Sequence, residues 1–513
     1  MDGRLAVQSP FNNQKEADVI LRTSDGANFY VYKNIISLAS SFFRDLFEIT
    51  QPTDTTSSLP TVDLPETRFI LDHLLRICYP VREPSFKSMP IQFVEDCLRA
   101  ARKYEMDYCV GVIERDLSPP MVGPLEPLNS DWSQQELYSL ACRFNLESLA
   151  NAAGHVIHYA TIAPTSNGES SEPGLYDFSH TVAGRVYDNC MGDIPAGSLR
   201  RLLRTQDAST FHSLKDVIFS RPPVPFQLVE QYAVIPFNSP EAFGPLDLVL
   251  QAMDGVRHLV NAKVVSDHST LLKSGAEGTT SHEKATEQAL PIVEVPLQSC
   301  ILAPVLHLVY HGEGETIPMM GLRQAETVFL AAKEYLNVTV ADSFMSRQLR
   351  NYVDGNPLRV YLLAARNGLE AVAEVAALVI ARRDLSREYD LEMERTEARY
   401  YVPLLQFAHE YKAAFIGAIS VTPAQKAKLW EYASDTWAKI CEYLGRDDEE
   451  DYDGLATALQ FVGKRFDPKA LPVDSGASRR SSRRGAAKGA QEDMGKSRVS
   501  RALKSVKLEL GPR

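Results

Sequence analysis

Histidine pairs are the first residues of this 513-residue sequence whose spacing suggests chemistry. His307 and His311 stand four apart, and His155 and His158 stand three apart, so each pair would share one helix face and offer two nitrogen ligands to a metal ion. Neither pair has an evident third ligand. We therefore expect solvent-facing or helix-end histidines, and we predict no metal site and no cofactor.

Catalytic motifs are equally scarce. The sequence contains no Gly-x-Ser-x-Gly elbow, no Walker-type or Gly-x-Gly-x-x-Gly phosphate loop and no His-Glu-x-x-His. Its seven cysteines are scattered singly without a CxxC pair, which is typical of reduced thiols inside the cell. We predict that the protein has no catalytic residues and is not an enzyme.

Charge divides the chain into an acidic body and a basic tail. Residues 473–513 hold eleven Lys and Arg against four Asp and Glu, a net +7, so the rest carries −19 of the overall −12. The tail has too few apolar residues for a core, and we expect it to be disordered. Its basic cluster comprises Arg479, Arg480, Ser481, Ser482, Arg483 and Arg484.

Three interpretations of this cluster stay open. It is a nuclear import signal or nucleic-acid tether, a site where phosphorylation of Ser481 or Ser482 reduces the positive charge, or a solubilising tail without a specific reader. The acidic body argues against nucleic-acid binding by the folded part, because neutralisation of phosphates dominates such affinity.

One stretch predicts how the folded part is built. Asp18–Thr23 and Phe29–Tyr32 flank Asp25-Gly26, which predicts a β-hairpin with a tight turn. Mixed three- and four-residue spacing then predicts helices packed on the apolar face of the hairpin. The residues with this spacing are Ile35, Ile36, Leu38, Phe42, Phe43, Leu46 and Phe47.

The same pattern recurs later in the chain, which indicates a duplication. A constant shift of 229 residues brings Asp18 onto Asp247, together with the Asp-Gly turn and the following Ile-Ile pair. A shift of 231 matches the stretch ending at Tyr79 with the one ending at Tyr310. Several ordered blocks at nearly one offset predict two copies of one module.

The first copy resembles a BTB/POZ domain. The usual His of that family is Tyr32 here, and the second copy has Asn261 and Ala262 at Tyr32 and Lys33. The Tyr-Pro ending and Gln51-Pro52 are most similar to the BTB proteins that fungi carry in large numbers. The pieces that carry the resemblance are Asp18-Val19-Ile20, Asp25-Gly26, Phe29–Tyr32, Lys33 through Phe43, Val62–Glu66, Leu74–Pro80 and Ala100–Met106.

Repeat and resemblance together predict an α+β fold of two tandem BTB/POZ-like modules. Each is a short mixed sheet packed by helices and continues into a helical extension. In the extensions, Leu137–Ala150 is predicted to form one amphipathic helix and Arg387–Phe407 a strongly helical stretch. The expected boundaries are 14–120 for the first module, 121–205 for its extension, 206–245 for a linker, 246–350 for the second module, 351–445 for its extension, and 446–513 for an acidic loop and the tail.

The resemblance implies protein–protein association. In BTB domains the Asp that matches Asp18 lies in a charged pocket near the dimer interface, and a structural hydrogen bond is the alternative. Tyr30 and Tyr32 offer an exposed aromatic edge, or they pack locally. The candidate interaction residues are Asp18, Tyr30, Tyr32, Lys33 and Asp247.

We predict a non-enzymatic interaction scaffold or adaptor inside the cell, in cytoplasm or nucleus, without a membrane span. The segment before Asp18 has room for only a stub around Leu5–Val7, whereas strand-swapped BTB dimers generally have more. The two copies are therefore expected to pair within the chain as a pseudo-dimer, with a homo-oligomer as the alternative.

Two other functions remain open. One is a substrate adaptor of a cullin-type ubiquitin ligase, although Gln51-Pro52-Thr53-Asp54 stands where such adaptors carry an apolar-x-Glu motif. The other is a nuclear or transcriptional regulator that uses the tail for localisation or nucleic-acid tethering.

Overall fold

A three-stranded sheet begins each of the two units into which the chain divides. One unit comprises Met1–Ser170 and Thr181–Val224, and the other comprises Ser171–His180 and Pro225–Arg513. The computed structural model describes residues 7–48, 59–118, 132–162, 178–205, 219–220, 232–238, 244–268, 290–312, 317–335, 338–383, 385, 388–419 and 506–508. None of the helices within these ranges combines the length and the apolar character needed to cross a membrane.

The first sheet contains the predicted hairpin. Its strands are β1 (Val19–Arg22), β2 (Asn28–Val31) and β3 (Thr61–Asp63), in the order β2-β1-β3. β1 runs antiparallel to β2 and parallel to β3. Gly26 has a φ of +78°, a conformation that glycine adopts without steric cost, and it closes the turn between β1 and β2.

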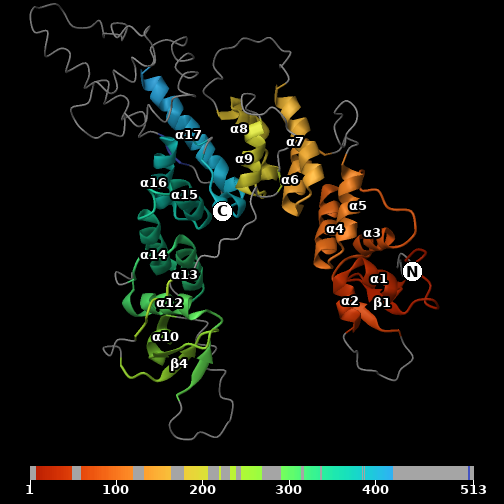
Figure 1. Cartoon of the computed structure of the whole chain (residues 1–513), viewed down its shortest axis with the longest axis horizontal. Coiled ribbons are helices and arrows are strands. Elements are labelled where there is room, and N and C mark those ends of the chain that lie inside the picture. Colours follow the sequence, from red (N-terminus) through yellow and green to blue (C-terminus); the bar gives the residue numbers. More distant parts are fainter. Residues whose placement is uncertain are drawn as a thin grey trace, which may run out of the picture. The chain divides into compact units, whose positions relative to one another are not determined.

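The helices of the first unit form two groups, of which α1 and α2 lie between β2 and β3 in the chain and the others follow β3. The first group is α1 (Lys33–Ala39), α2 (Ser41–Glu48), α3 (Arg68–Cys78), α4 (Ile91–Lys103) and α5 (Asp107–Leu117). The second group is α6 (Gln134–Phe144), α7 (Glu147–Ile162), α8 (Val182–Val186), the 3-10 helix η3 (Asn189–Met191) and α9 (Ala196–Thr205). Figure 1 shows α3, α4 and α5 beside β1, and α6 and α7 next along the unit.

The single helix predicted over Leu137–Ala150 is wrong. Asn145 takes the left-handed conformation, with φ +53°, and separates α6 from α7. An asparagine in this conformation ends a helix, while the apolar spacing continues across it, so periodicity alone did not reveal the break.

The second sheet repeats the topology of the first. Its strands are β4 (Leu248–Gln251), β5 (Arg257–Val260) and β6 (Ile292–Glu294), in the order β5-β4-β6. β4 is antiparallel to β5 and parallel to β6, and Val249 pairs with both Leu259 and Ile292. Ile20 pairs with Tyr30 and Thr61 in the same way in the first sheet.

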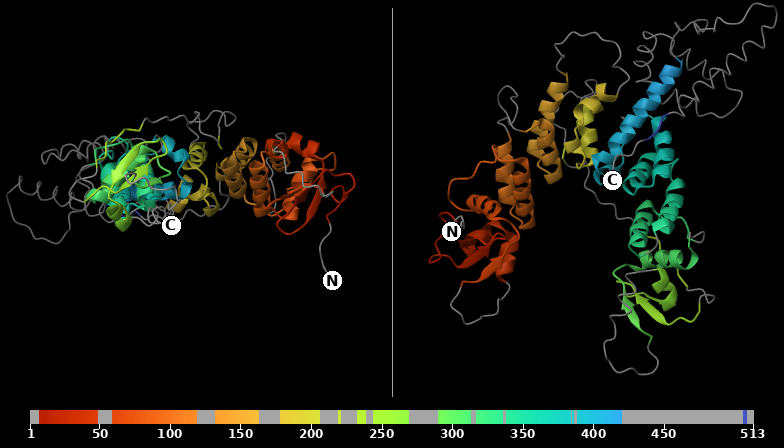
Figure 2. Two further views of the ribbon diagram at one scale, coloured as in Figure 1. Left: turned by 90° about the horizontal axis from the view of Figure 1, so that it is seen from below. Right: turned by 180° about the vertical axis from the view of Figure 1, so that it is seen from behind.

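The helices of the second unit come in a similar order along the chain, and the right-hand view of Figure 2 shows them continuing from the second sheet. They are α10 (Ala262–His268), α12 (Ser299–His311), α13 (Leu322–Tyr335), α14 (Val338–Arg350), α15 (Pro357–Arg366), α16 (Glu370–Ala381) and α17 (Ala398–Ile419), with the 3-10 helices η2 (Phe178–His180) and η6 (Leu391–Glu394). Within the helical stretch predicted over Arg387–Phe407, a short connection separates η6 from α17.

Corresponding long-range hydrogen bonds occur in both units. The hydroxyl of Tyr79 accepts a hydrogen bond from the backbone N–H of Tyr32 at 2.8 Å. The hydroxyl of Tyr310 accepts one from the backbone N–H of Asn261 at 2.7 Å. The first bond connects the residue after α3 to the junction of β2 and α1. The second connects the last turn of α12 to the junction of β5 and α10.

Corresponding contacts also occur within each of the two helical extensions. Tyr138 donates its hydroxyl hydrogen to the carbonyl of Ser198 at 2.9 Å, and Tyr361 donates to the carbonyl of Tyr400 at 3.0 Å. Each tyrosine thus connects the first helix of its extension to the last. An ion pair links each extension to its module in the same way: Arg143 with Glu95 in one unit, and Arg366 with Glu326 in the other.

We expect Tyr79→Phe and Tyr310→Phe to destabilise the unit that contains each residue. Either change leaves a backbone N–H without its acceptor, which costs about 1–3 kcal/mol when the group is buried. Pulse proteolysis in urea, with peptides from each unit followed by mass spectrometry, measures the two stabilities separately. Tyr108→Phe, on an exposed side chain, is the control. An unchanged stability after either substitution would contradict the structural role of the hydroxyl groups.

Candidate interaction site

The two candidate aspartates serve the same local purpose. Asp18 precedes β1, and its carboxylate accepts a hydrogen bond at 2.6 Å from the backbone N–H of Lys33, the first residue of α1. Asp247 accepts one from Ala262, the first residue of α10, also at 2.6 Å. Both carboxylates satisfy a helix-terminal donor that has no partner inside its helix. An interaction role for these residues stays a prediction beside this structural one.

Tyr32 and Lys33 lie beside Asp18 at the junction of the hairpin and α1. The Tyr32 hydroxyl donates to a Glu16 carboxylate at 3.3 Å, and its ring stacks on that of Tyr79 with centroids 6.4 Å apart. Loss of hydration, together with the carboxylates of Glu16 and Asp18, raises the pKa of Tyr32. The Lys33 ammonium lies 5.7 Å from the centroid of the Phe47 ring.

Tyr30 stands apart from this group, on β2. Its side chain is half-buried, and its backbone N–H donates to the carbonyl of Phe11 at 3.0 Å. The Phe11 segment therefore already accepts the hydrogen bond that this edge position of β2 could offer to a partner.

Phe11 was not among the predicted site residues, although it organises this region. Its ring is fully buried, 5.0 Å from the Tyr79 ring and 5.9 Å from the Phe29 ring. Phe237 takes the same place in the second unit, 5.4 Å from Tyr310 and 6.1 Å from His258. The sequence did contain a signal, because each phenylalanine is the middle residue of a Pro-Phe-Asn tripeptide.

His307 packs against this second phenylalanine. Its ring meets that of Phe237 at a right angle with centroids 5.2 Å apart, and its Nε2 lies 2.9 Å from the carbonyl oxygen of Pro236. The expectation of a merely solvent-facing or helix-end histidine therefore missed a packing role. Within the described ranges, no group of three or more His, Cys, Asp or Glu side chains is placed to hold a metal ion.

The first unit presents apolar side chains on α1 and α2. Leu38 is 91% exposed, Phe42 is also exposed, and Ile35 is half-buried. The prediction that Leu38 packs on the hairpin is therefore wrong. Its counterpart in the second unit is the exposed Asp267, so this apolar surface differs between the units. We call Ile35, Leu38 and Phe42 the α1–α2 surface.

The second unit instead exposes apolar residues on its sheet. Leu259 and Ile292 are exposed on either side of the half-buried Val249, with which both pair. The corresponding row in the first sheet is Tyr30, Ile20 and Thr61, all half-buried.

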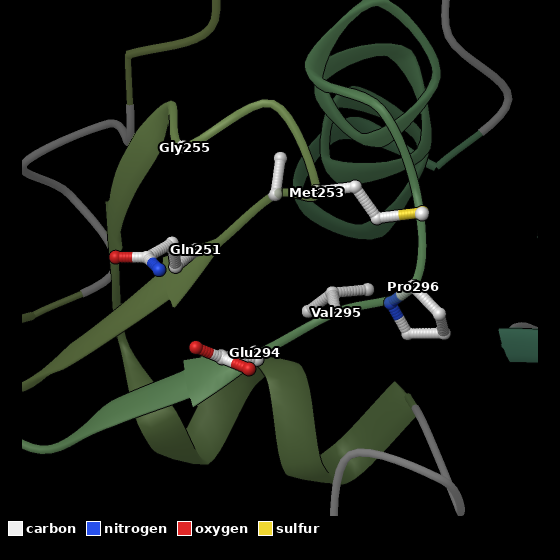
Figure 3. Close-up of a pocket in the computed structure, with 7 residues that line it drawn as sticks. Gln251, Met253, Gly255, Glu294, Val295 and Pro296 are labelled. Atoms are coloured by element: carbon white, nitrogen blue, oxygen red, sulfur yellow. The ribbon is translucent and has the colours of Figure 1, made fainter.

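A pocket of about 430 Å³ lies at the end of the second sheet (Figure 3). It is lined by Gln251, Ala252, Met253, Gly255, Glu294, Val295 and Pro296. Two backbone hydrogen bonds join the segments that line it. The N–H of Val295 donates to the carbonyl of Gln251, and the N–H of Met253 donates to the carbonyl of Leu297. In the first unit, an ion pair between Arg22 and Asp63 joins the residues that match Gln251 and Glu294.

The first sheet, helices α1 to α5 and the Phe11 segment before the sheet form one continuous module. Residues 7–119 match the family model of the BTB/POZ domain. The match covers this BTB domain, including Phe11, and leaves the second unit outside it. BTB domains are protein–protein interaction modules, and residues 7–119 have the mixed α+β fold of such a domain. A search of curated proteins found no match to the chain.

Several predicted features lie outside the described residues. These are the Gln51–Asp54 segment that bears on cullin binding, and the basic cluster Arg479, Arg480, Ser481, Ser482, Arg483 and Arg484.

His258 is expected to make the second unit sensitive to acid. Burial lowers its pKa from 6.5, although Asp254 opposes the shift, and its Nε2 has no hydrogen-bond partner among the described residues. The unfolded chain therefore binds a proton more readily than the folded unit, and stability falls as the pH drops below 6.5.

His258→Phe is the direct test of this sensitivity, because the first unit carries Phe29 at the matching position. Calorimetry between pH 7 and pH 5 should show the wild-type midpoint of the second unit falling further than that of the variant. A difference between the two midpoints that does not change with pH would contradict this account.

Proposed function

We propose that this chain is a non-enzymatic scaffold or adaptor, and that the α1–α2 surface of its BTB domain binds a protein partner through an apolar contact. The 91% exposure of Leu38 carries this proposal. Within a domain of a protein-interaction family, an apolar side chain that contributes nothing to its own core is a candidate contact residue. Phe42 extends the surface, because its side chain is also exposed. Its ring packs against that of Tyr104, with centroids 5.4 Å apart.

We further propose that residues 232–419 are a second, diverged copy of the BTB-type module with its helical extension. Equal strand order, the tyrosine hydroxyl bonds, the aspartate caps and the paired phenylalanines support this. The exposed Asp267 in place of Leu38 favours a different partner, or a supporting role, for this copy. Pairing of the two copies as a pseudo-dimer stays a prediction, and a monomeric mass in solution would favour it.

We propose an intracellular location, in cytoplasm or nucleus. The six cysteines among the described residues are free thiols, which suits a reducing compartment. A nuclear role for the basic cluster rests on its composition alone.

Leu38→Asp tests the proposed contact and introduces the residue that the second copy carries. Burying a leucine at an interface contributes about 1.5–3 kcal/mol, so we expect partner affinity to fall by about tenfold or more. The fold should be unaffected, because changes at such exposed positions usually alter stability by less than about 0.5 kcal/mol.

The measurement is quantitative mass spectrometry of proteins captured by the tagged full-length chain from its native cells. Phe69→Ser replaces an exposed apolar side chain outside the α1–α2 surface with a polar one and is the control. We expect the specific partners, including further copies of the chain, to be depleted by Leu38→Asp and retained by Phe69→Ser. Equal capture by wild type and Leu38→Asp would overturn the proposed contact.

A further inference from the structure

Two cysteines from different helices of the BTB domain lie in contact. The Sγ atoms of Cys78, the last residue of α3, and Cys109, in α5, are 3.6 Å apart. Cys78 is partly exposed and Cys109 is buried. Cys109 also points its thiol at the carbonyl of Leu74, at 3.8 Å. Because 31 residues separate the two cysteines in sequence, the folded structure alone creates the pair.

We propose that Cys78 and Cys109 form a peroxide-sensitive dithiol that closes to a disulfide within the folded BTB domain. The partly exposed sulfur of Cys78 meets the oxidant, and the buried sulfur of Cys109 then displaces the oxygen to form the disulfide. Both sulfurs are already in contact, so a disulfide requires a small approach of the two side chains rather than a rearrangement of the fold.

The reaction takes place in two steps. The thiolate of Cys78 attacks one oxygen of hydrogen peroxide, the O–O bond breaks, and a sulfenic acid and a hydroxide ion form. The sulfur of Cys109 then attacks the Cys78 sulfur, the S–S bond forms and the S–O bond breaks. The leaving hydroxide takes the proton of Cys109 and becomes water. Overall, two thiols lose two hydrogen atoms and one peroxide is reduced to two waters.

The surroundings assign the two roles. The hydrogen-bonding contact with Cys109 lowers the pKa of Cys78, whereas the same contact and burial raise the pKa of Cys109. Thiolate character and access to solvent are the properties that direct oxidation to one cysteine. Cys97 is buried nearby on α4, and burial raises its pKa to about 12, so it is a poorer target.

The alternative is that both cysteines serve only as small apolar residues. The second unit has Val309 and Val340 at the matching positions, which shows that valine suits this kind of site. That correspondence supplies a control: the Cys78→Val, Cys109→Val double variant should keep the packing and lose the chemistry.

Oxidation would act next to the residue that holds the hairpin. Cys78 is followed by Tyr79, whose hydroxyl binds the N–H of Tyr32 and whose ring packs on Phe11. A Cys78–Cys109 bond would fix this end of α3 to α5. Cross-linking residues so far apart in sequence also restricts the unfolded chain.

The test treats folded full-length protein with hydrogen peroxide, blocks remaining thiols with N-ethylmaleimide, and maps disulfides by non-reducing peptide mass spectrometry. We expect a Cys78–Cys109 linked peptide that dithiothreitol reverses, unchanged formation in Cys97→Ser, and no link in Cys78→Ser. Oxidation should raise the thermal midpoint of the wild-type first unit and leave that of the double valine variant unchanged.

Three results would overturn the proposal. In the first, Cys78 and Cys109 both remain free thiols after a treatment that oxidises other cysteines. In the second, Cys78 is oxidised to sulfinic acid while Cys109 still reacts with maleimide. In the third, the disulfide forms only when the chain is oxidised in urea.

Discussion

The hydroxyl of one tyrosine is the contact on which the arrangement of each module depends. Where the hairpin turns into a helix, a backbone N–H would be buried without a partner, and such a group is costly. Tyr79 supplies the acceptor in the first unit and Tyr310 in the second, each from the end of a helix distant in sequence. The same rings cover Phe11 and Phe237, so one residue joins the sheet, two helices and the segment before the sheet.

The two units share a frame of buried contacts but differ in the side chains that they expose. The first presents apolar side chains on α1 and α2, whereas the second places Asp267 there and exposes Leu259 and Ile292 on its sheet. Stability depends on the buried contacts, which both units keep. The exposed residues differ between the units, and under the proposed function they would decide which partner each unit binds. The Cys78–Cys109 pair belongs to the first unit alone, since the second has valine at both positions.

The hairpins could be predicted because their information is local. The turn at Asp25-Gly26 sets the register in which β1 pairs with β2. The constant sequence offset predicts the same pairing for β4 and β5 in the second sheet. The helix break at Asn145 was missed, since a single left-handed residue leaves the apolar spacing intact; Gly368, also at positive φ, marks the matching position in the second unit. The Phe11 contact and the exposure of Leu38 were missed because both depend on which distant surfaces fold together.

We propose that the second unit is built on the same frame as the BTB domain. Residue-resolved hydrogen exchange of the native full-length chain tests it most directly, at the amides of Tyr32 and Lys33 and at those of Asn261 and Ala262. The account predicts slow exchange for both pairs, since tyrosine hydroxyls and aspartate carboxylates accept their hydrogens. Protected amides at Tyr32 and Lys33 beside freely exchanging ones at Asn261 and Ala262 would contradict it.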